Sequence, residues 1–386
     1  MTGRRVPSPR DVLELLKPVT WFPPMWAFMC GVVSSGVPLA DRWGLLVAGM
    51  VLAGPLVCGN SQAINDWFDR HVDAINEPNR PIPSGRIPGR WGLGIAIAGT
   101  IVSLLIGWAI NPVVGAATVL GVFLAWIYSA PPIRAKANGW WGPGVCAAAY
   151  EGLTWFTGAA VMVGGMPDAR IIAVLALYAA GAHGIMVLND FKAVTGDAVS
   201  GVRSLPVLLG VDRAARVACW TMAVPQLVVA GLLAHWGAIF AAAAVALSVA
   251  IQFLLMQRLL ADPAKEAPRY NATGAHGIMV LNDFKAVEGD RVSNVRSLPV
   301  LLGERRAAVL ACYTMALPQL LVAVLLSHWG ARPSAVLVIV SIGAQFLLMQ
   351  RLLSNPVKFA PFYNATGTSL YVLGMLASAF GLRALA

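Results

Sequence analysis

Three aspartates follow a long apolar segment of the sequence. The apolar segment is Trp43–Ala63, and Asp66, Asp69 and Asp73 come directly after it. If the helix continues past this segment, spacings of three and four residues place the three carboxylates on one face. Charged groups are costly near a bilayer, so acids gathered there indicate a use for them. The cluster predicts binding of a divalent metal that holds a phosphorylated ligand, because proteins hold Mg²⁺ with a few carboxylates plus substrate phosphate oxygens.

Polar and basic residues accompany these aspartates. Asn65 directly precedes Asp66, while Arg80 and Arg86 follow close behind in a stretch rich in Asn and Pro. A solvated helix end that carries ordinary acids is the plainer interpretation. The periodicity of the acids and the tail Asn76–Gly85 argue against it, and the arginines suit a phosphorylated ligand.

A second acidic cluster occurs twice in the chain. The first occurrence has two carboxylates where the second has three, because Thr195 stands in the place of Glu288. A polar loop between spans is the alternative interpretation. Two acidic clusters on one side of the membrane predict two metal-bound faces that clamp one diphosphate and stabilise its departure. The residues are Asp190, Lys192 and Asp197 in the first occurrence, and Asp283, Lys285, Glu288 and Asp290 in the second.

A prenyl diphosphate fits such a clamp, since its tail can lie among apolar helices. Aromatic faces such as those of Trp67, Trp155 or Tyr128 can stabilise an allyl cation, although aromatic residues at membrane interfaces are the commoner occurrence. Arg134 and Lys136 can reach phosphate or can belong to an ordinary positively charged loop. For His183 and His276 we expect neutral packing roles rather than metal or pigment binding.

The composition places the chain in a bilayer. Of 386 residues 58% are hydrophobic and 12% charged, and the mean hydropathy is +0.70. Runs of about 20 apolar residues have the length of a transmembrane helix. We expect eleven spans: residues 20–35, 43–64, 92–110, 112–128, 143–163, 171–188, 216–234, 238–260, 309–326, 334–353 and 368–382.

The basic residues indicate orientation rather than nucleic-acid binding. The net charge of +10 comes from residues spread over short loops. Among the spans, Arg42, Arg170, Arg332 and Arg383 fall on one side and the other Lys and Arg residues on the opposite side. The positive-inside rule then places the N-terminus and both acidic clusters in the cytoplasm. The N-terminus lacks a signal-peptide pattern, and five isolated cysteines support neither a disulfide framework nor a zinc site.

The chain contains a tandem repeat. Residues 182–274 recur as residues 275–367, with about 66 of 93 positions identical. A full span precedes the acidic loop of the first copy, whereas only Asn271–Leu281 precedes that of the second. This piece has about half the length of a span. We therefore expect it to dip into the membrane or lie on its surface, which keeps the second loop cytoplasmic.

The motifs resemble those of the UbiA-type intramembrane prenyltransferases, and within them those of the chlorophyll synthases. The resemblance covers nearly the whole chain and rests on KPVTWFPPMWAF, NDWFDRHVDAINEPNRPIPSGRIPG, YSAPPIRAKANGWWGP, YEGLTWFTGA and LNDFKAVEGDR. It implies nine helices around a central cavity, Mg²⁺, and transfer of a geranylgeranyl or phytyl group from its diphosphate to the propionate of bacteriochlorophyllide or chlorophyllide. It also implies the inner membrane of a phototrophic bacterium, including its photosynthetic intracytoplasmic membrane.

The resemblance also implies roles for the residues. Asp66, Asp69 and Asp73 would bind diphosphate-bound Mg²⁺ from one side, with Asn65, Arg80, Arg86 and Lys136 near the phosphates. Asp283, Glu288 and Asp290, or Asp190 and Asp197, would bind it from the other side, next to Lys285 or Lys192. The extra 93 residues depart from the family layout, since removing either copy leaves 293 residues and nine spans. Only one copy can then occupy the usual place.

The expected architecture is all-α: a polytopic membrane bundle with a UbiA-type core of nine helices plus a duplicated two-helix module. We expect four segments: residues 1–181 with the first acidic motif, 182–274 and 275–367 with the two copies of the second, and 368–386 with a terminal span. Alternative functions are prenylation of a quinone precursor or haem, a transporter or pigment-binding membrane protein, and a scaffold inactivated by its duplication.

Overall fold

The computed structural model describes residues 6–191, 194, 197, 198, 201–262, 298–328, 330 and 332–355. In this part of the chain the regular elements are helices, and one isolated bridge joins Asn138 to Arg203. Seven of the described helices, of 18 to 33 residues, are long and apolar enough to cross a bilayer. The predicted all-α, multi-pass membrane class is therefore confirmed.

The chain divides into two compact units. One comprises Met1–Met186, Val202–Leu205 and Trp220–Val249, and the other comprises Val187–Gly201, Pro206–Cys219 and Ala250–Ala386.

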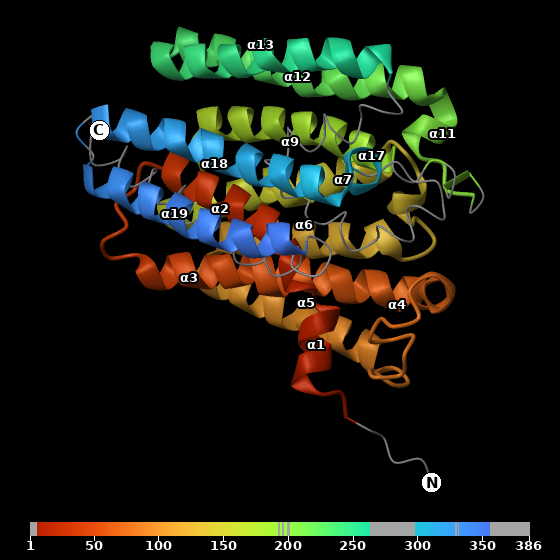
Figure 1. The fold of residues 1–386 in the computed structure, drawn as a ribbon. Helices are drawn as coiled ribbons and strands as arrows, with labels where there is room; N and C mark the ends of the chain where they lie inside the picture. Colours follow the sequence, from red (N-terminus) through yellow and green to blue (C-terminus); the bar gives the residue numbers. More distant parts are fainter. Residues whose placement is uncertain are drawn as a thin grey trace. The chain divides into compact units, whose positions relative to one another are not determined.

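A long helix in the first unit carries the first acidic cluster. It consists of α3 (Trp43–Val51), the π-helical segment η2 (Leu52–Cys58) and α4 (Gly59–Asn76), which follow one another without a break (Figure 1). Pro55 lies inside η2 and has no N–H to donate, so the regular hydrogen-bond ladder is interrupted there. The helix continues past the apolar segment, as the spacing of the aspartates predicts.

A second helix of the first unit is interrupted in the same way. It is formed by α7 (Trp141–Ala147), the π-helical η4 (Ala148–Leu153) and α8 (Thr154–Val163). It corresponds to the span expected at residues 143–163. Both π-helical segments fall within expected spans, and such segments are frequent at functional sites.

Glycines bring α8 close to α2 (Phe22–Ser34). A Cβ added to Gly158 would lie 2.0 Å from the carbonyl oxygen of Phe28, and one added to Gly31 would lie 2.0 Å from that of Trp155. Only residues without a side chain let two backbones approach this closely, which is how membrane helices pack in the absence of a strong hydrophobic driving force.

Three other helices of the first unit, α1, α5 and α6, pack against α4. The helix α5 packs against both α4 and α6, and the N-terminal α1 contacts α4. The buried cluster at this junction contains Leu15, Ala63, Ile64, Ile87 and Ala96. The bounds are α1 Pro9–Leu15, η1 Pro18–Thr20, α5 Trp91–Ile110, α6 Pro112–Ser129, η3 Ala135–Ala137 and α9 Ala169–Asp190.

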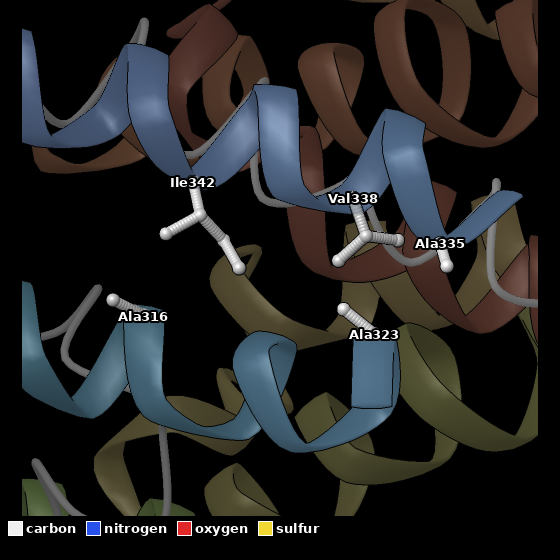
Figure 2. Close-up of a cluster of buried hydrophobic side chains, with 5 residues drawn as sticks. All are labelled: Ala316, Ala323, Ala335, Val338 and Ile342. Atoms are coloured by element: carbon white, nitrogen blue, oxygen red, sulfur yellow. The ribbon is translucent and has the colours of Figure 1, made fainter. Parts of the chain in front are cut away.

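In the second unit, α18 (Glu304–His328) and α19 (Arg332–Ser354) lie side by side (Figure 1). Figure 2 shows the small side chains of α18 facing those of α19 across this interface. The side chains of Gln319 and Gln345 exchange two hydrogen bonds, of 3.1 and 3.3 Å, within it. Buried amides that satisfy each other avoid the cost of unpaired polar groups in an apolar setting. The cluster consists of Ala316, Ala323, Ala335, Val338 and Ile342.

The described parts of the two copies of the sequence repeat contain matching helices. The boundaries of three described helices in the first copy recur 93 residues later in the described part of the second. The first set is α11 (Leu205–Leu209), α12 (Val211–His235) and α13 (Ile239–Ala261), and the second is α17 (Leu298–Leu302), α18 and α19. The expected dip at Asn271–Leu281 and the expected span at 368–382 lie outside the described residues.

The close approach of α2 and α8 yields a test. Gly158→Ala places a Cβ against the backbone of Phe28, and such overpacking typically costs about 1–3 kcal/mol. We expect a lower free energy of unfolding in detergent. Gly94→Ala is the matched control, since a Cβ there meets no atom within 4 Å and the change suits a helix. Equal losses in both variants would contradict the tight packing of α2 on α8.

Candidate functional site

The three aspartates of α4 lie close to the core of the first unit. Asp66 is fully buried, Asp73 is 7% exposed, and Asp69 is partly buried. Their neighbours Ala63 and Ile64 lie in the apolar cluster that fixes α4 against α1 and α5. An ionised carboxylate in such a setting requires a partner or a metal. The structure supplies cationic partners from three separate segments of the chain.

Lys17 and Arg80 pair with the inner two carboxylates. The Nζ of Lys17 lies 2.6 Å from Asp66 Oδ1, and Nη1 of Arg80 lies 2.8 Å from Asp73 Oδ2 and 3.4 Å from Asp66 Oδ1. Arg80 also forms an ion pair with Glu77. Its burial works against the charge, but the bond to Glu77 and the nearby carboxylates prevail, so the pKa of Arg80 is raised. The sequence assignment of Arg80 to the first cluster thus has a geometric basis.

Sequence reasoning missed Lys17. This residue connects α1 to η1 and has a φ of +47°, a left-handed conformation that is unusual for a lysine. In that position its side chain reaches Asp66 from 49 residues away in the sequence. The available signal was a lone basic residue between an amphipathic helix and an apolar span.

Asp69 has its own set of partners. Lys136 Nζ lies 2.5 Å from Asp69 Oδ2, and Arg134 Nη2 lies 3.2 Å from Asp69 Oδ1. Asn65 Nδ2 donates to Asp69 Oδ2 at 3.2 Å, while Asn65 Oδ1 accepts from Lys136 at 2.9 Å. Burial lowers the pKa of Lys136, against the opposing effect of Asp69. Lys136 and Asn65, both expected near phosphate, therefore join the first acidic cluster.

The loop that carries Lys136 is held by backbone pairing. Arg203 N donates to the carbonyl of Ala137 at 3.1 Å, and Gly139 N donates to the carbonyl of Arg203 at 2.8 Å. Asn138 Oδ1 accepts from the backbone N–H of Trp140 at 2.9 Å. These bonds fix the backbone from which Lys136 points toward α4.

Arg86 is engaged elsewhere in the unit. Its guanidinium lies 2.7 Å from Asp11 and 2.6 Å from Glu14, and it donates to the carbonyl of Asn79 at 2.8 Å. The hydrogen bond from Arg86 lowers the pKa of Glu14 and raises that of Arg86. Arg86 thus ties α1 to the tail that follows α4, rather than lying among the three aspartates.

The second acidic cluster is described in part. Asp190 ends α9 in the other compact unit, where burial and then the nearby charge of Asp197 raise its pKa to about 7. The other expected residues of this cluster lie outside the described part of the chain: Lys192, Asp283, Lys285, Glu288 and Asp290.

The first cluster has a ligating oxygen suited to a divalent cation. Asp66 Oδ2 is buried and has no hydrogen-bond partner, and carboxylate oxygens are the ligands that Mg²⁺ prefers. No three His, Cys, Asp or Glu side chains converge into a complete metal-binding group within the described residues. The residues present therefore fit a cation that takes its remaining ligands from phosphate and water, as Mg²⁺ commonly does.

A cavity of about 260 Å³ opens beside this cluster. Both π-helical segments line it, through Val57 of η2 and Ala149 of η4, and Leu124 of α6 adds to its apolar wall. Asn65 also lines the cavity, so one residue touches both the ionic cluster and the apolar space. Such a space can hold the apolar part of a ligand whose charged part lies among the aspartates.

The three aromatic residues that could stabilise an allyl cation lie in different surroundings. Tyr128 lines the cavity. In contrast, Trp155 stacks on Tyr178 with ring centroids 5.5 Å apart, and Trp67 lies under the guanidinium of Arg70. The ring of His183 stacks on Trp140 at 5.9 Å, as expected for a packing histidine.

A protein-family model matches the part of the chain that contains the acidic helix. The model of the UbiA prenyltransferase family matches residues 20–274, about two thirds of the chain. The chain belongs to the UbiA prenyltransferase family. The predicted family is therefore confirmed, and the matched region ends with the first copy of the repeat.

Relatives in this UbiA family include pigment enzymes. The chain is 58% identical over 271 residues to the bacteriochlorophyll synthase 33 kDa chain of Cereibacter sphaeroides, covering 70% of this chain and 90% of that protein. It is 38% identical over 275 residues to the chloroplastic chlorophyll synthase of Oryza sativa subsp. japonica, covering 68% of this chain and 72% of that protein.

Solved UbiA structures share the fold. A digeranylgeranylglyceryl phosphate synthase structure matches with a TM-score of 0.59 at 20% identity, covering 68% of this chain and 91% of that one. A UbiA homologue from Archaeoglobus fulgidus, bound to GPP and Mg²⁺, matches with a TM-score of 0.55 at 21% identity, covering 68% of this chain and 97% of that one. At these identities the likeness establishes the fold alone.

Removal of the Lys17 ammonium tests the pairing of Asp66. Breaking a buried ion pair costs about 3–5 kcal/mol, and we expect the lower end for Lys17→Met because Arg80 remains 3.4 Å from Asp66. Lys17→Arg should retain most of the free energy of unfolding. Arg10→Met, at an exposed basic position of α1, is the control. Unchanged unfolding of Lys17→Met in detergent would mean that Asp66 does not depend on Lys17.

Proposed function

We propose that this protein is a bacteriochlorophyll synthase. In this reaction the propionate carboxylate of bacteriochlorophyllide, or of chlorophyllide, is esterified with a geranylgeranyl or phytyl group, and diphosphate is released. The observation that carries the proposal is the 58% identity to a named bacteriochlorophyll synthase over 90% of its length. Identity at this level leaves little room for a different acceptor site.

The cationic residues suit the departure of diphosphate. We infer that Lys17, Arg80 and Lys136, which pair with the aspartates, also lie within reach of a bound diphosphate. Mg²⁺ held by Asp66, Asp69 and Asp73 would neutralise charge on the leaving group as its C–O bond breaks. Positively charged groups already fixed around the leaving oxygen stabilise that charge without reorganisation. Asn65 joins this ionic region to the cavity.

The second acidic cluster would approach the diphosphate from its other side. We propose Asp190 and Asp197, or Asp283, Glu288 and Asp290, for this role, with Lys192 or Lys285 beside the phosphates. Burial and the charge of Asp197 raise the pKa of Asp190 to about 7, and a bound cation would favour its ionised form. Arg86 has a weaker case for phosphate contact, because its guanidinium is already shared by two carboxylates and a carbonyl.

Other acceptors have less support. A digeranylgeranylglyceryl phosphate synthase from Methanothrix thermoacetophila is 31% identical to this chain, well below the values for the pigment enzymes. The ionisable groups of the first cluster gather toward the C-terminal end of the long helix formed by α3, η2 and α4 rather than at its middle, which argues against a transporter.

We infer that the protein lies in the inner membrane, including photosynthetic intracytoplasmic membrane, with its N-terminus and acidic loops in the cytoplasm. The bias of Lys and Arg between the loops supports this orientation. Each repeat would form a module of one acidic loop and two long helices, residues 182–274 and 275–367, before a terminal span at 368–386. One module would complete the prenyltransferase core, and the other would be an appended lobe.

The decisive assay uses membranes that contain the full chain. We expect esterified pigment, identified by mass, from bacteriochlorophyllide, geranylgeranyl diphosphate and Mg²⁺, and its loss with a chelator. Asp66→Asn should lower the rate at least about 100-fold, since it removes one charge from the metal and leaving-group site. Asp41→Asn, in an exposed loop, is the matched control. Inserted, intact protein that makes no ester would contradict the proposed function.

The two copies of the second motif can be compared directly. Asp190→Ala and Asp283→Ala remove equivalent carboxylates, and we expect one of the two changes to abolish esterification while the other leaves it near the parent rate. The sensitive variant identifies the module that completes the site. Full activity in both variants would eliminate the second acidic clamp.

A further inference from the structure

The wall of the cavity beside α4 carries three polar side chains whose hydrogen bonds to one another are separate from the ion pairs of the three aspartates. Tyr150 of η4 points its hydroxyl toward the long helix, where Gln62 Nε2 lies 3.1 Å and Cys58 Sγ 3.3 Å from the phenol oxygen. All three side chains line the cavity. Gln62 lies one helical turn before Asn65 and Asp66, on the part of the helix that leads into the apolar segment.

We propose that Gln62 and Tyr150 bind and orient the carboxylate of the acceptor. This inference rests on the proposed function and adds to it the residues that position the nucleophile. It assigns to these two side chains a specificity for an acceptor that presents a carboxylate on a flexible arm.

The hydrogen bonds between these side chains leave N–H and O–H donors of Gln62 and Tyr150 available to a ligand. The phenol oxygen of Tyr150 accepts from Gln62 Nε2. The single S–H of Cys58 can reach either this oxygen or the carbonyl of Thr20, each 3.3 Å away. When the thiol donates to the phenol oxygen, the Tyr150 proton is left for a ligand in the cavity. The Gln62 amide has two N–H groups and uses one of them on Tyr150. Two other polar side chains on the wall donate to the backbone: Ser61 to the carbonyl of Cys58 and Thr154 to that of Tyr150.

The wall of the cavity is neutral. None of its described lining residues is Asp, Glu, Lys, Arg or His. A carboxylate that enters this space must therefore be held by neutral donors. Their hydrogen bonds offset part of the free-energy cost of removing the carboxylate from water. Neutral donors can orient the anion by hydrogen bonds, without the ion pair that an ammonium or guanidinium group would form with it.

The order of groups along the helix suits displacement from the side opposite the leaving group. Asp66 and Asp69 lie at one end, Asn65 next to them, and Gln62 with Tyr150 about one turn, or roughly 5 Å, deeper. The prenyl C1 would lie between them. A carboxylate oxygen forms the new bond to C1, the bond from C1 to the diphosphate oxygen breaks, and its electron pair leaves with diphosphate. No proton is transferred, because the acceptor enters as a carboxylate.

The size of the cavity agrees with this role. Its volume of about 260 Å³ is below the roughly 300–1,000 Å³ of pockets that enclose drug-sized ligands. It can take the reacting ends of the two substrates rather than a whole tetrapyrrole. The arm that bears the carboxylate would reach in while the macrocycle stays outside.

Tyr150→Phe and Gln62→Met test the proposal in membranes that contain the full chain. Loss of a hydrogen bond to a charged group typically weakens binding by about 10- to 100-fold. We expect the KM for bacteriochlorophyllide to rise by about that factor, with the KM for geranylgeranyl diphosphate within about twofold of the parent. We also expect more geranylgeraniol relative to ester, because water captures a prenyl group whose acceptor is misplaced.

Controls separate this role from a structural one. Tyr178→Phe removes the hydroxyl of a tyrosine that stacks on Trp155 instead of lining the cavity, and it should behave like the parent. Binding of a non-hydrolysable prenyl thiodiphosphate should be unchanged in every variant, which shows that the donor site is folded.

The outcomes distinguish this inference from the proposed function. If the parent forms ester but Tyr150→Phe and Gln62→Met keep its acceptor KM and its ratio of ester to alcohol, the inference is wrong and the proposed function stands. Loss of both ester and alcohol with intact thiodiphosphate binding would also overturn it, because the two residues would then act on ionisation. No ester from the intact parent would overturn both.

Discussion

Charge pairing at the end of α4 is the constraint on which the first unit depends. The helix emerges from an apolar span with Asp66 fully buried and Asp73 nearly so. Ionised carboxylates in such a place are tolerated only with close cations or a metal. Lys17, Arg80 and Lys136 provide the cations from the segment before η1, the tail after α4 and the loop after α6. The same attraction therefore builds the site and holds three segments of chain in place.

This pairing also explains how one cluster can serve an anionic ligand and a metal. A diphosphate competes for the ammonium and guanidinium groups, whereas a divalent cation competes for the carboxylates. Both exchanges replace one strong electrostatic contact by another, so neither leaves an uncompensated charge behind. Below the ionic rim the wall becomes neutral and largely apolar. The two π-helical segments lie at this transition, where they place Val57 and Ala149 on the cavity.

The duplication separates the effects of local sequence and tertiary setting. Two copies with about 66 identical positions of 93 form helices with the same boundaries. In the second copy Gln319 exchanges two hydrogen bonds with Gln345, and in the first copy its counterpart Gln226 donates to the carbonyl of Met222. Helix boundaries follow from local hydrophobic pattern, turns and glycines.

The sequence by itself determined the membrane class, the family and the helix that carries Asp66, Asp69 and Asp73, because these depend on composition, periodicity and short motifs. It also placed Lys136 and Arg80 among the candidates, since Arg80 closely follows the aspartates and Lys136 stands with Arg134 in a short loop. Only the tertiary structure decided that Lys17 pairs with Asp66 across 49 residues, and that Gln62 meets Tyr150 across 88. It also decided that Arg86 binds α1 instead of the aspartates. Such contacts join distant segments through packing and burial, whereas the pattern of a linear sequence reports only on neighbours along one helix.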